Sequence, residues 1–131
     1  MRRPWRARPA KAPGRRRIDP APVLLFRYSA LTFNGHRIHC DRSYATGVEG
    51  YPGLMVQGPL IATLLLDLLR RERPDAQVTA FRFKAIRPTF AGQPMHVHGI
   101  PTDDGKSVRL WATDRDGWLT MDATAMLRPA P

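Results

Sequence analysis

The chain of 131 residues, 43% of them hydrophobic, can form one folded domain with one core but is too short for two. Eight of its 21 basic residues and none of its acidic residues fall in residues 1–17, which leaves 13 basic and 11 acidic residues in 18–131. This near-neutral remainder argues against a nucleic-acid partner for the folded part, and the single cysteine, Cys40, excludes an internal disulfide and a multi-cysteine zinc site.

The basic N-terminal segment, residues 1–20, is predicted to be a disordered tail, because the prolines among its arginines oppose a continuous helix. The prolines and the lack of serine also count against an amphipathic transit peptide. The folded domain is then expected at 21–131. No apolar run reaches the roughly 18 residues of a membrane span, so we expect a cytoplasmic protein without a membrane segment.

The first strand is predicted at 23–28, where residues typical of strands follow a proline-rich linker. Residues 34–56 show no long periodic pattern, and we expect one short helix there, at about 36–45. The dipeptide Asn34-Gly35 between apolar residues is also typical of a hairpin turn, which is an alternative for this segment.

A long apolar helix is predicted over 59–71. Gly58-Pro59 marks its start, because proline suits the first helical position, and Pro74 marks its end. Leucine, isoleucine and alanine side chains surround its axis almost completely, so the helix is expected to be buried on nearly all sides. Its length of roughly 20 Å would let it cross one face of a small sheet.

Four strands in an antiparallel meander are expected after this helix. Apolar and polar residues alternate over 77–87 and again around residues 95–98, 108–112 and 118–125. Two Asp-Gly dipeptides, ending at Gly105 and Gly117, predict tight turns between strands. His96 and His98 alternate onto the polar side of their strand, where solvent exposure is expected.

A curved antiparallel sheet wrapped around one long buried helix is the hotdog architecture, an α+β fold. The sequence resembles the MaoC-like dehydratase/hydratase family, above all its branch of 3-hydroxyacyl-thioester dehydratases and mesaconyl-CoA hydratases. The resemblance is carried by residues 29–39 (SALTFNGHRIH), by the pairs 41–42 and 44–45, and by 49–54 and 58–60. Members of this branch usually hold two hotdog halves in one chain, and this chain resembles the C-terminal half.

The resemblance implies reversible dehydration of a 3-hydroxyacyl thioester, or hydration of the enoyl form, by a hydro-lyase. It implies no metal or redox cofactor, with coenzyme A entering as part of the substrate. In the family an acidic residue and a histidine five positions apart move protons. His39 takes the histidine position, but Asn34 stands at the acidic position, and an amide can orient water or a hydroxyl without acting as a base. Gly58 would present a backbone N–H to the enolate oxygen at the helix N-terminus.

Further substrate-binding residues are expected around these three. Asp41 is considered as a group that fixes a histidine tautomer, and Arg82 and Lys84 as partners for coenzyme A phosphates. Two departures from the family pattern, at Cys40 and Gln57, would alter or abolish activity. The expected substrate-binding set is His36, Arg37, Asp41, Tyr51, Gly53, Gln57, Arg82 and Lys84.

Several alternatives stay open at this point. The same fold could serve an acyl-CoA thioesterase, or a non-catalytic half that completes a partner's active site, and a nucleic-acid binder would rest on the tail alone. His36 and His39 lack a third metal ligand nearby, and Cys40 lacks a supporting catalytic triad. The expected partners are an acyl-CoA or acyl-carrier-protein thioester and a second hotdog unit, in a homodimer or a heterodimer, because the apolar helix at 59–69 needs more cover than one short sheet gives.

Overall fold

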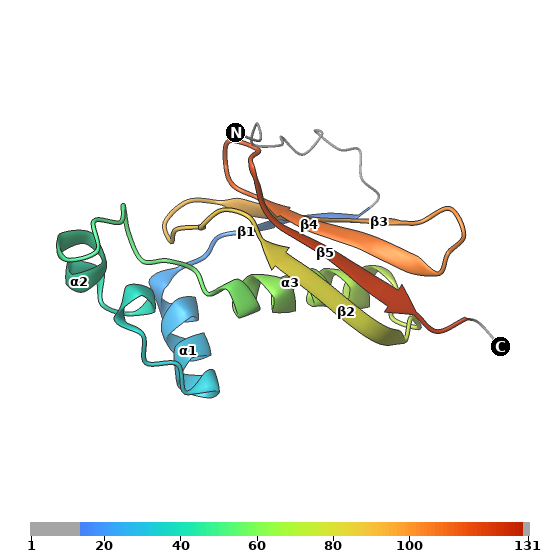
Figure 1. Cartoon of the computed structure of the whole chain (residues 1–131), viewed down its shortest axis with the longest axis horizontal. Helices are drawn as coiled ribbons and strands as arrows, with labels where there is room; N and C mark the ends of the chain where they lie inside the picture. Colours follow the sequence, from blue (N-terminus) through green and yellow to red (C-terminus); the bar gives the residue numbers. More distant parts are fainter. Residues whose placement is uncertain (1–13, 130–131) are drawn as a thin grey trace.

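The computed structural model describes residues 14–129, which form one sheet and four helical segments. The sheet lies against α3, and α1, η1 and α2 gather beyond the N-terminal end of that helix (Figure 1). In chain order the elements are β1 (Gly14–Ile18), α1 (Pro22–Thr32), the 3-10 turn η1 (Arg37–His39), α2 (Arg42–Gly47), α3 (Gly58–Glu72), β2 (Val78–Ala85), β3 (Met95–Pro101), β4 (Ser107–Thr113) and β5 (Leu119–Leu127).

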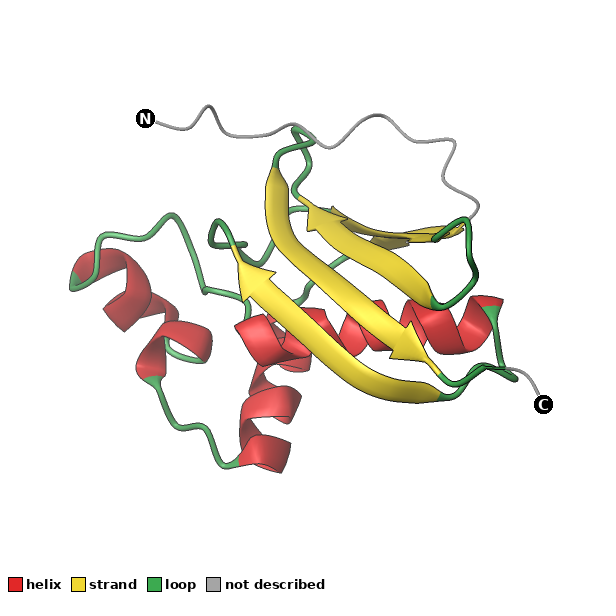
Figure 2. Ribbon diagram, turned by 45° about the vertical axis from the view of Figure 1, so that its right-hand side comes forward, coloured by secondary structure: helices red, strands yellow, loops and turns green. Residues whose placement is uncertain are grey.

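The helix predicted at 59–71 is confirmed as α3, which forms the centre of the core. Figure 2 shows α3 running along one side of the twisted sheet. Its buried leucines, such as Leu65 and Leu68, pack with inward-facing strand residues such as Met95 and Met121, and each buried leucine stabilises the fold by about 1.5–3 kcal/mol. Thr63, however, is exposed, and Leu64 and Leu66 are only half-buried, so this chain leaves one side of α3 incompletely covered.

The strands predicted after α3 are all present, but their order in the sheet is β1-β3-β4-β5-β2. β3, β4 and β5 form the expected meander, with tight turns in which Gly105 and Gly117 adopt positive φ angles of 69° and 83°. The prediction of a four-strand meander is wrong for β2. The long connection over residues 86–94 carries the chain across the sheet, and β2 pairs antiparallel with β5 rather than with β3.

Part of the segment expected to be a disordered tail is a strand. β1 pairs antiparallel with β3, and its Ile18 is buried in the core. Arg16 makes an ion pair of 3.0 Å with Asp67 on α3, which fixes this edge of the sheet to the helix. The tail boundary at residue 20 is therefore wrong, because pairing with β3 and the burial of Ile18 order this edge strand. Residues 1–13 lie outside the described residues.

The strand predicted at 23–28 is wrong, because this segment belongs to helix α1. Pro22 occupies the first helical turn, where its missing N–H costs nothing, and Leu25 and Ser29 are buried one turn apart. The strand-forming residues are mostly on the exposed side, with Phe26 61% exposed. The tertiary contact between α1 and the start of α3 therefore outweighs the strand propensity of these residues.

The segment after α1 contains two short helical pieces where one was predicted. η1 ends at His39, and Asp41 starts α2 by accepting a hydrogen bond from the Tyr44 N–H at 3.1 Å. The hairpin alternative at Asn34-Gly35 is wrong, because Asn34 closes the end of α1 by donating its N–H to the Ser29 carbonyl at 2.9 Å. No helix within residues 14–129 is both long and apolar enough to cross a membrane.

The prediction that His98 is exposed is also wrong, since only 4% of it is accessible. Its ring stacks on Trp111 at 5.1 Å with an angle of 8° between the planes, and its Nε2 lies 2.9 Å from Thr113 Oγ1. Burial, followed by the charges of Arg15 and His96, lowers the pKa of His98 to about 4. His98 is therefore a neutral part of the sheet near pH 7.

Candidate active site

The N-terminus of α3 has backbone donors without partners. Gln57, the residue before the helix, makes no side-chain cap; its Nε2 donates instead to the Leu25 carbonyl at 2.8 Å and to Ser29 Oγ at 2.9 Å. Pro59 has no N–H, and the N–H groups of Gly58 and Leu60 form no hydrogen bond with any described residue. Two free donors therefore lie at the positive end of a buried helix dipole, where a negative oxygen is stabilised.

A cavity of about 300 Å³ adjoins Gly58. A Cβ added at Gly58 would have Met121 Cε, at 4.0 Å, as its nearest neighbour, so packing within this chain does not require glycine there. The missing side chain instead leaves the backbone open to a ligand in the cavity. The cavity is lined by Met55, Val56, Gly58, Ile61, Ala85, Ile86, Arg87, Pro88, Thr89, Thr120 and Met121.

His39 is held in one tautomer by Met55, which lines this cavity, although His39 itself is not among the described residues that line it. It is 8% exposed, and its Nδ1 lies 2.6 Å from the carbonyl oxygen of Met55, a residue that lines the cavity. A carbonyl oxygen only accepts hydrogen bonds, so Nδ1 must carry the proton and donate it. Nε2 of His39 therefore keeps its lone pair and is the nitrogen available to take a proton.

Asn34 belongs to the same end of the molecule, but its side-chain oxygen is engaged. Asn34 Oδ1 accepts a hydrogen bond from the His36 N–H at 3.2 Å. The exposed His36 ring lies edge-on to the His39 ring, with 5.8 Å between the centroids. The Nδ2 group of Asn34 makes no hydrogen bond with the described residues, so it is free to contact a hydroxyl or a water molecule.

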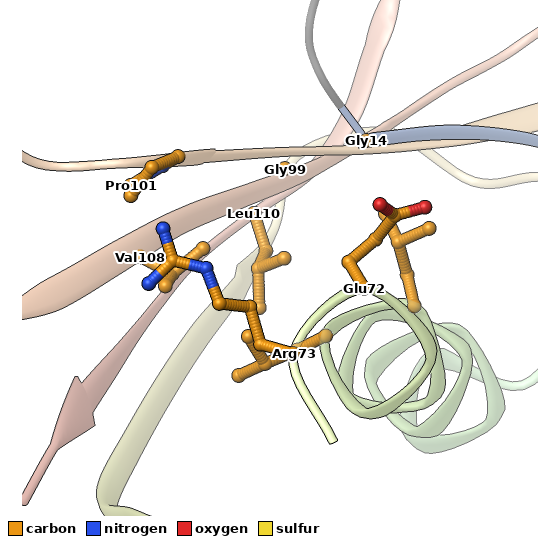
Figure 3. Close-up of a pocket in the computed structure, with 9 residues that line it drawn as sticks. Gly14, Glu72, Arg73, Gly99, Pro101, Val108 and Leu110 are labelled. Carbon is orange, nitrogen blue, oxygen red and sulfur yellow. The ribbon is translucent and has the colours of Figure 1, made fainter. Parts of the chain in front are cut away.

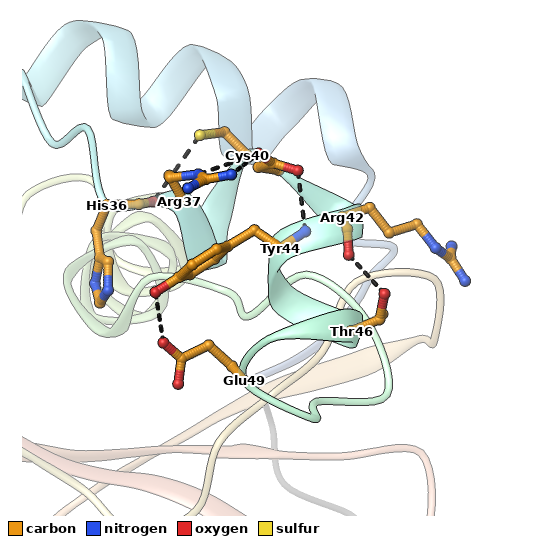
Figure 4. A network of polar contacts seen from close by, with 8 residues as sticks. His36, Arg37, Cys40, Arg42, Tyr44, Thr46 and Glu49 are labelled. Atoms are coloured by element: carbon orange, nitrogen blue, oxygen red, sulfur yellow. Dashed lines mark hydrogen bonds and ion pairs between the residues drawn. The ribbon is translucent and has the colours of Figure 1, made fainter.

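The expected role of Asp41 toward a histidine is not what the structure shows. Its carboxylate forms an ion pair with Arg37 at 2.9 Å and accepts a hydrogen bond from the Tyr44 N–H (Figure 4). The hydrogen bond from Tyr44 and, after it, the contact with Arg37 lower the pKa of Asp41. The Arg37 guanidinium lies 4.2 Å above the Tyr44 ring, whose hydroxyl donates to Glu49 at 2.7 Å. Arg37 and Asp41 thus join η1 to α2, and Met55 orients His39 instead.

The other expected substrate-binding residues are spread over the fold. Gln57 is 1% exposed, and its Nε2 group holds α1 against α3, whereas its buried Oε1 has no hydrogen-bond partner among the described residues. Tyr51 packs at 5.9 Å on Phe90, and Gly53 is buried in the same region. Arg82 and Lys84 are exposed on the edge strand β2.

Sequence reasoning missed Met55, Thr89 and Thr120 as residues of the site. Met55 acts through its carbonyl oxygen, which carries no side-chain signal in a sequence. Thr89 and Thr120 are brought to the cavity by the loop after β2 and by the start of β5, two segments 31 residues apart in the chain. No spacing rule connects such positions.

A second cavity, of about 190 Å³, lies at the opposite end of α3 (Figure 3). Leu68 and Leu110 line it, and Glu72 and Arg73 extend from the end of α3 beside it. Gly14 and Gly99 also line this cavity, as a directly paired residue couple of β1 and β3. Because a 15-residue helix is about 22 Å long, this cavity is remote from Gly58 and His39.

The fold and the site define a hotdog protein with an uncapped helix end and with a histidine of fixed tautomer that is bound to the segment leading into this helix. The chain belongs to the family described as hydroxyacyl-thioester dehydratase type 2, whose model matches residues 2–91. The predicted family and the predicted hotdog fold are both confirmed.

Two curated relatives and two solved structures illustrate the match. Mesaconyl-C(4)-CoA hydratase of Chloroflexus aurantiacus is 46% identical over 86% of this chain and 39% of its own length. The mitochondrial hydroxyacyl-thioester dehydratase type 2 of Schizosaccharomyces pombe is 41% identical over 61% of this chain and 27% of its own. An (R)-hydratase from A. caviae has a TM-score of 0.78 at 17% identity, covering 95% of this chain and all of that one. A chain of the ChsH1-ChsH2 complex of Mycobacterium tuberculosis has a TM-score of 0.73 at 16% identity, covering 88% of this chain and 93% of that one.

The chain thus spans about two fifths of the length of the first relative and about a quarter of the second.

Proposed function

We propose that this chain is a hydro-lyase domain that adds water to an enoyl thioester and removes it from a 3-hydroxyacyl thioester. One observation carries the proposal: the cavity is lined both by Gly58, at the uncapped start of α3, and by Met55, whose carbonyl accepts a hydrogen bond from Nδ1 of His39. A base and an oxyanion site are the two elements that proton exchange next to a thioester needs. The relatives' names agree with this chemistry.

In the dehydration direction, Nε2 of His39 removes the proton from the carbon next to the thioester carbonyl. The negative charge moves to the carbonyl oxygen, which accepts hydrogen bonds from the N–H groups of Gly58 and Leu60. Nε2–H then protonates the leaving hydroxyl as the C–O bond breaks, and water leaves with no net change at His39. Asn34 Nδ2 orients the hydroxyl. Hydration runs through the same steps in reverse.

No oxidation or reduction occurs in this reaction, and every proton that moves is carried by His39 or the substrate. Coenzyme A, or a carrier protein's equivalent arm, is part of the substrate and supplies the phosphates. The exposed cations Arg82 and Lys84 on β2 are the proposed partners of those phosphates.

A second hotdog unit completes the proposed enzyme, either another copy of this chain or a separate first half. Leu64 and Leu66 on α3 are only half-buried, and Phe83 on the edge strand β2 is 48% exposed. The chain matches only 39% of its Chloroflexus relative, and one of the similar structures is titled as a complex of two proteins. These facts support a pair of hotdog units.

The test of the activity is the loss of enoyl-thioester absorbance when the purified chain is mixed with crotonyl-CoA. A steady fall of absorbance together with 3-hydroxybutyryl-CoA formation supports the proposal. Release of free thiol without a hydrated product would show a thioesterase instead.

A binding-only half is a second candidate, and one observation favours it: the residue at the acidic position is the amide Asn34, with its oxygen bound to the His36 N–H. Under that candidate the wild-type chain binds crotonyl-CoA without turning it over. Asn34→Asp should then create activity, whereas in an active wild type it should keep or raise the rate. Binding is measured by calorimetry and turnover by absorbance on the same preparations.

A further inference from the structure

The residues that lead into α3 connect the separate parts of the candidate site. Met55 is bound to η1 by two hydrogen bonds, one of which comes from the imidazole of His39. The Nε2 group of Gln57 is bound to α1 by two hydrogen bonds, of 2.8 and 2.9 Å. Gly58 follows directly and carries one of the two N–H groups that have no partner among the described residues. The four residues 55–58 are thus joined to both segments that precede them in the site.

Ser29 extends this connection from α1 to Asn34. Its hydroxyl accepts the hydrogen bond from Gln57 Nε2 at 2.9 Å, and its carbonyl accepts one from the Asn34 N–H, also at 2.9 Å. The side chains proposed to act on the reacting hydroxyl and proton, those of Asn34 and His39, are therefore both tied to the start of α3. Gln57 makes the first of these connections through Ser29, and Met55 makes the second directly.

The amide of Gln57 is oriented by its partners. The Leu25 carbonyl only accepts hydrogen bonds, so the atom 2.8 Å from it must be the Nε2 donor. Oε1 is then buried with no hydrogen-bond partner among residues 14–129. A buried oxygen without a partner offsets much of the stability that the two hydrogen bonds of Nε2 supply. Stability alone therefore does not explain a glutamine at this position.

Residue 57 also stands at the N-cap position of α3. A short polar side chain at an N-cap accepts a hydrogen bond from the N–H of the second or third helical residue. The second residue of α3 is Pro59, which has no N–H, so a cap here would occupy the N–H of Leu60. The longer side chain of Gln57 is bound to α1 instead, so the Leu60 N–H stays uncapped.

We propose that Gln57 is a positioning residue of this site. Its hydrogen bonds to α1 hold Asn34 in place relative to the helix end, and they keep its side chain away from the Leu60 N–H, which stays open to the thioester oxygen. A reacting group displaced by about 1 Å lowers a rate by up to about 100-fold, so the loss of Gln57 should act on kcat. The part of this inference that concerns turnover rests on the proposed hydro-lyase function. The part that concerns the Leu60 N–H requires only that the chain binds an acyl thioester.

The kinetic test removes the hydrogen bonds of Gln57 and keeps its volume. Gln57→Met forms no bond to α1 and cannot cap α3, so kcat with crotonyl-CoA should fall about tenfold while KM changes less than about threefold. Ser29→Ala removes one acceptor and should lower kcat less. The two changes together should lower kcat no further than Gln57→Met alone, because they break the same connection. Thr32→Ala is the matched control, since it removes a hydroxyl hydrogen bond within α1, and it should keep the wild-type kcat.

A binding test needs no turnover and separates this inference from the hydro-lyase proposal. Butyryl-CoA has no double bond to hydrate, and its thioester oxygen should shift the amide resonance of Leu60 when it binds the wild-type chain or Gln57→Met. Gln57→Asn supplies a short N-cap side chain that occupies this N–H, so the Leu60 resonance should not respond to the ligand. Gln57→Asn should also hydrate crotonyl-CoA at least about tenfold more slowly than Gln57→Met.

If the Leu60 resonance responds as expected while crotonyl-CoA is not hydrated, the hydro-lyase proposal fails and the role of Gln57 at the helix end stands. A wild-type kcat in Gln57→Met would overturn the inference, and so would a Leu60 resonance that responds alike in Gln57→Asn and the wild type. Losses of kcat that follow the unfolding midpoint in every variant, the Thr32→Ala control included, would show a role in stability only, and the inference would be wrong.

Discussion

The Nδ1 atom of His39 lies 2.6 Å from the carbonyl oxygen of Met55, a residue 16 positions later in the chain. Met55 N–H in turn donates to the Ile38 carbonyl at 2.9 Å, so the two segments are joined by two hydrogen bonds, one from the imidazole and one between their main chains. This arrangement fixes both the tautomer of His39 and its position against the loop that leads into α3. An orienting carboxylate is unnecessary here, because the main chain supplies the acceptor.

His39→Ala should lower turnover of crotonyl-CoA by roughly 10²–10⁴-fold, because it removes the only group at this site proposed to carry the proton. The loss of this buried ring should lower stability but leave the protein folded, because the main-chain hydrogen bond between Met55 and Ile38 remains, and a thermal unfolding curve checks this. His96→Ala, on the outer side of β3, is the control and should keep the wild-type rate. A His39→Ala protein with a near-wild-type rate would remove this residue from the mechanism.

Gly58→Val should reduce kcat/KM by at least about 10²-fold, because the new side chain would stand between the substrate oxygen and the free N–H groups of α3. A Cβ at this position lies 4.0 Å from its nearest neighbour, Met121 Cε, and the unfolding midpoint checks whether the fold tolerates the two further carbons of valine. The measurement is steady-state kinetics together with the unfolding midpoint. Unchanged kinetics in a folded variant would place the oxyanion site elsewhere.

Most of the sheet and its helix could be predicted from the sequence, because patterns of local residues specify them. Gly58-Pro59 and the leucine run mark α3, and the alternating segments and Asp-Gly turns mark β2 to β5. β1 and α1 could not be predicted, because their formation depends on distant contacts. Arg16 reaches Asp67 on α3, and Leu25 and Ser29 receive the Gln57 amide, 32 and 28 residues away.

The candidate site was predicted in the same uneven way. His39 and Gly58 stand out because side-chain chemistry and a helix start can be read from sequence. Met55 could not be found, since a backbone carbonyl acts there. The idea that Asp41 fixes a histidine tautomer is wrong, because its carboxylate binds Arg37 and the Tyr44 N–H instead. Polar residues in a motif thus predict where a site lies better than what each one contacts.

His98 should make the protein less stable in mild acid. Its pKa of about 4 in the folded state lies below the 6.5 of the unfolded chain, because burial, Arg15 and His96 disfavour its charged form. The unfolded state therefore binds a proton first as the pH falls through 6.5, and stability decreases until about pH 4. Between pH 7 and 4.5 the free energy of unfolding should fall by about 2–3 kcal/mol from this residue.

Urea unfolding of the wild type and His98→Gln at these two pH values tests this effect. The variant should lose less stability on acidification than the wild type, because glutamine does not titrate. Parallel losses in both proteins would show that His98 is not responsible.

We predict that the chain forms a dimer of two hotdog units. Light scattering should give about twice the 14.8 kDa of a single chain, because β2 is an edge strand with an exposed Phe83 and α3 leaves Leu64 and Leu66 half-covered. Phe83→Lys should shift the population toward monomer and reduce turnover with it, whereas Val48→Lys, a 71% exposed residue at the end of α2, should not. A monomer that hydrates crotonyl-CoA at full rate would contradict the prediction.

If the chain dissolves only when it is produced together with a separate hotdog protein, the pair is a heterodimer, and turnover should then appear only in the mixture.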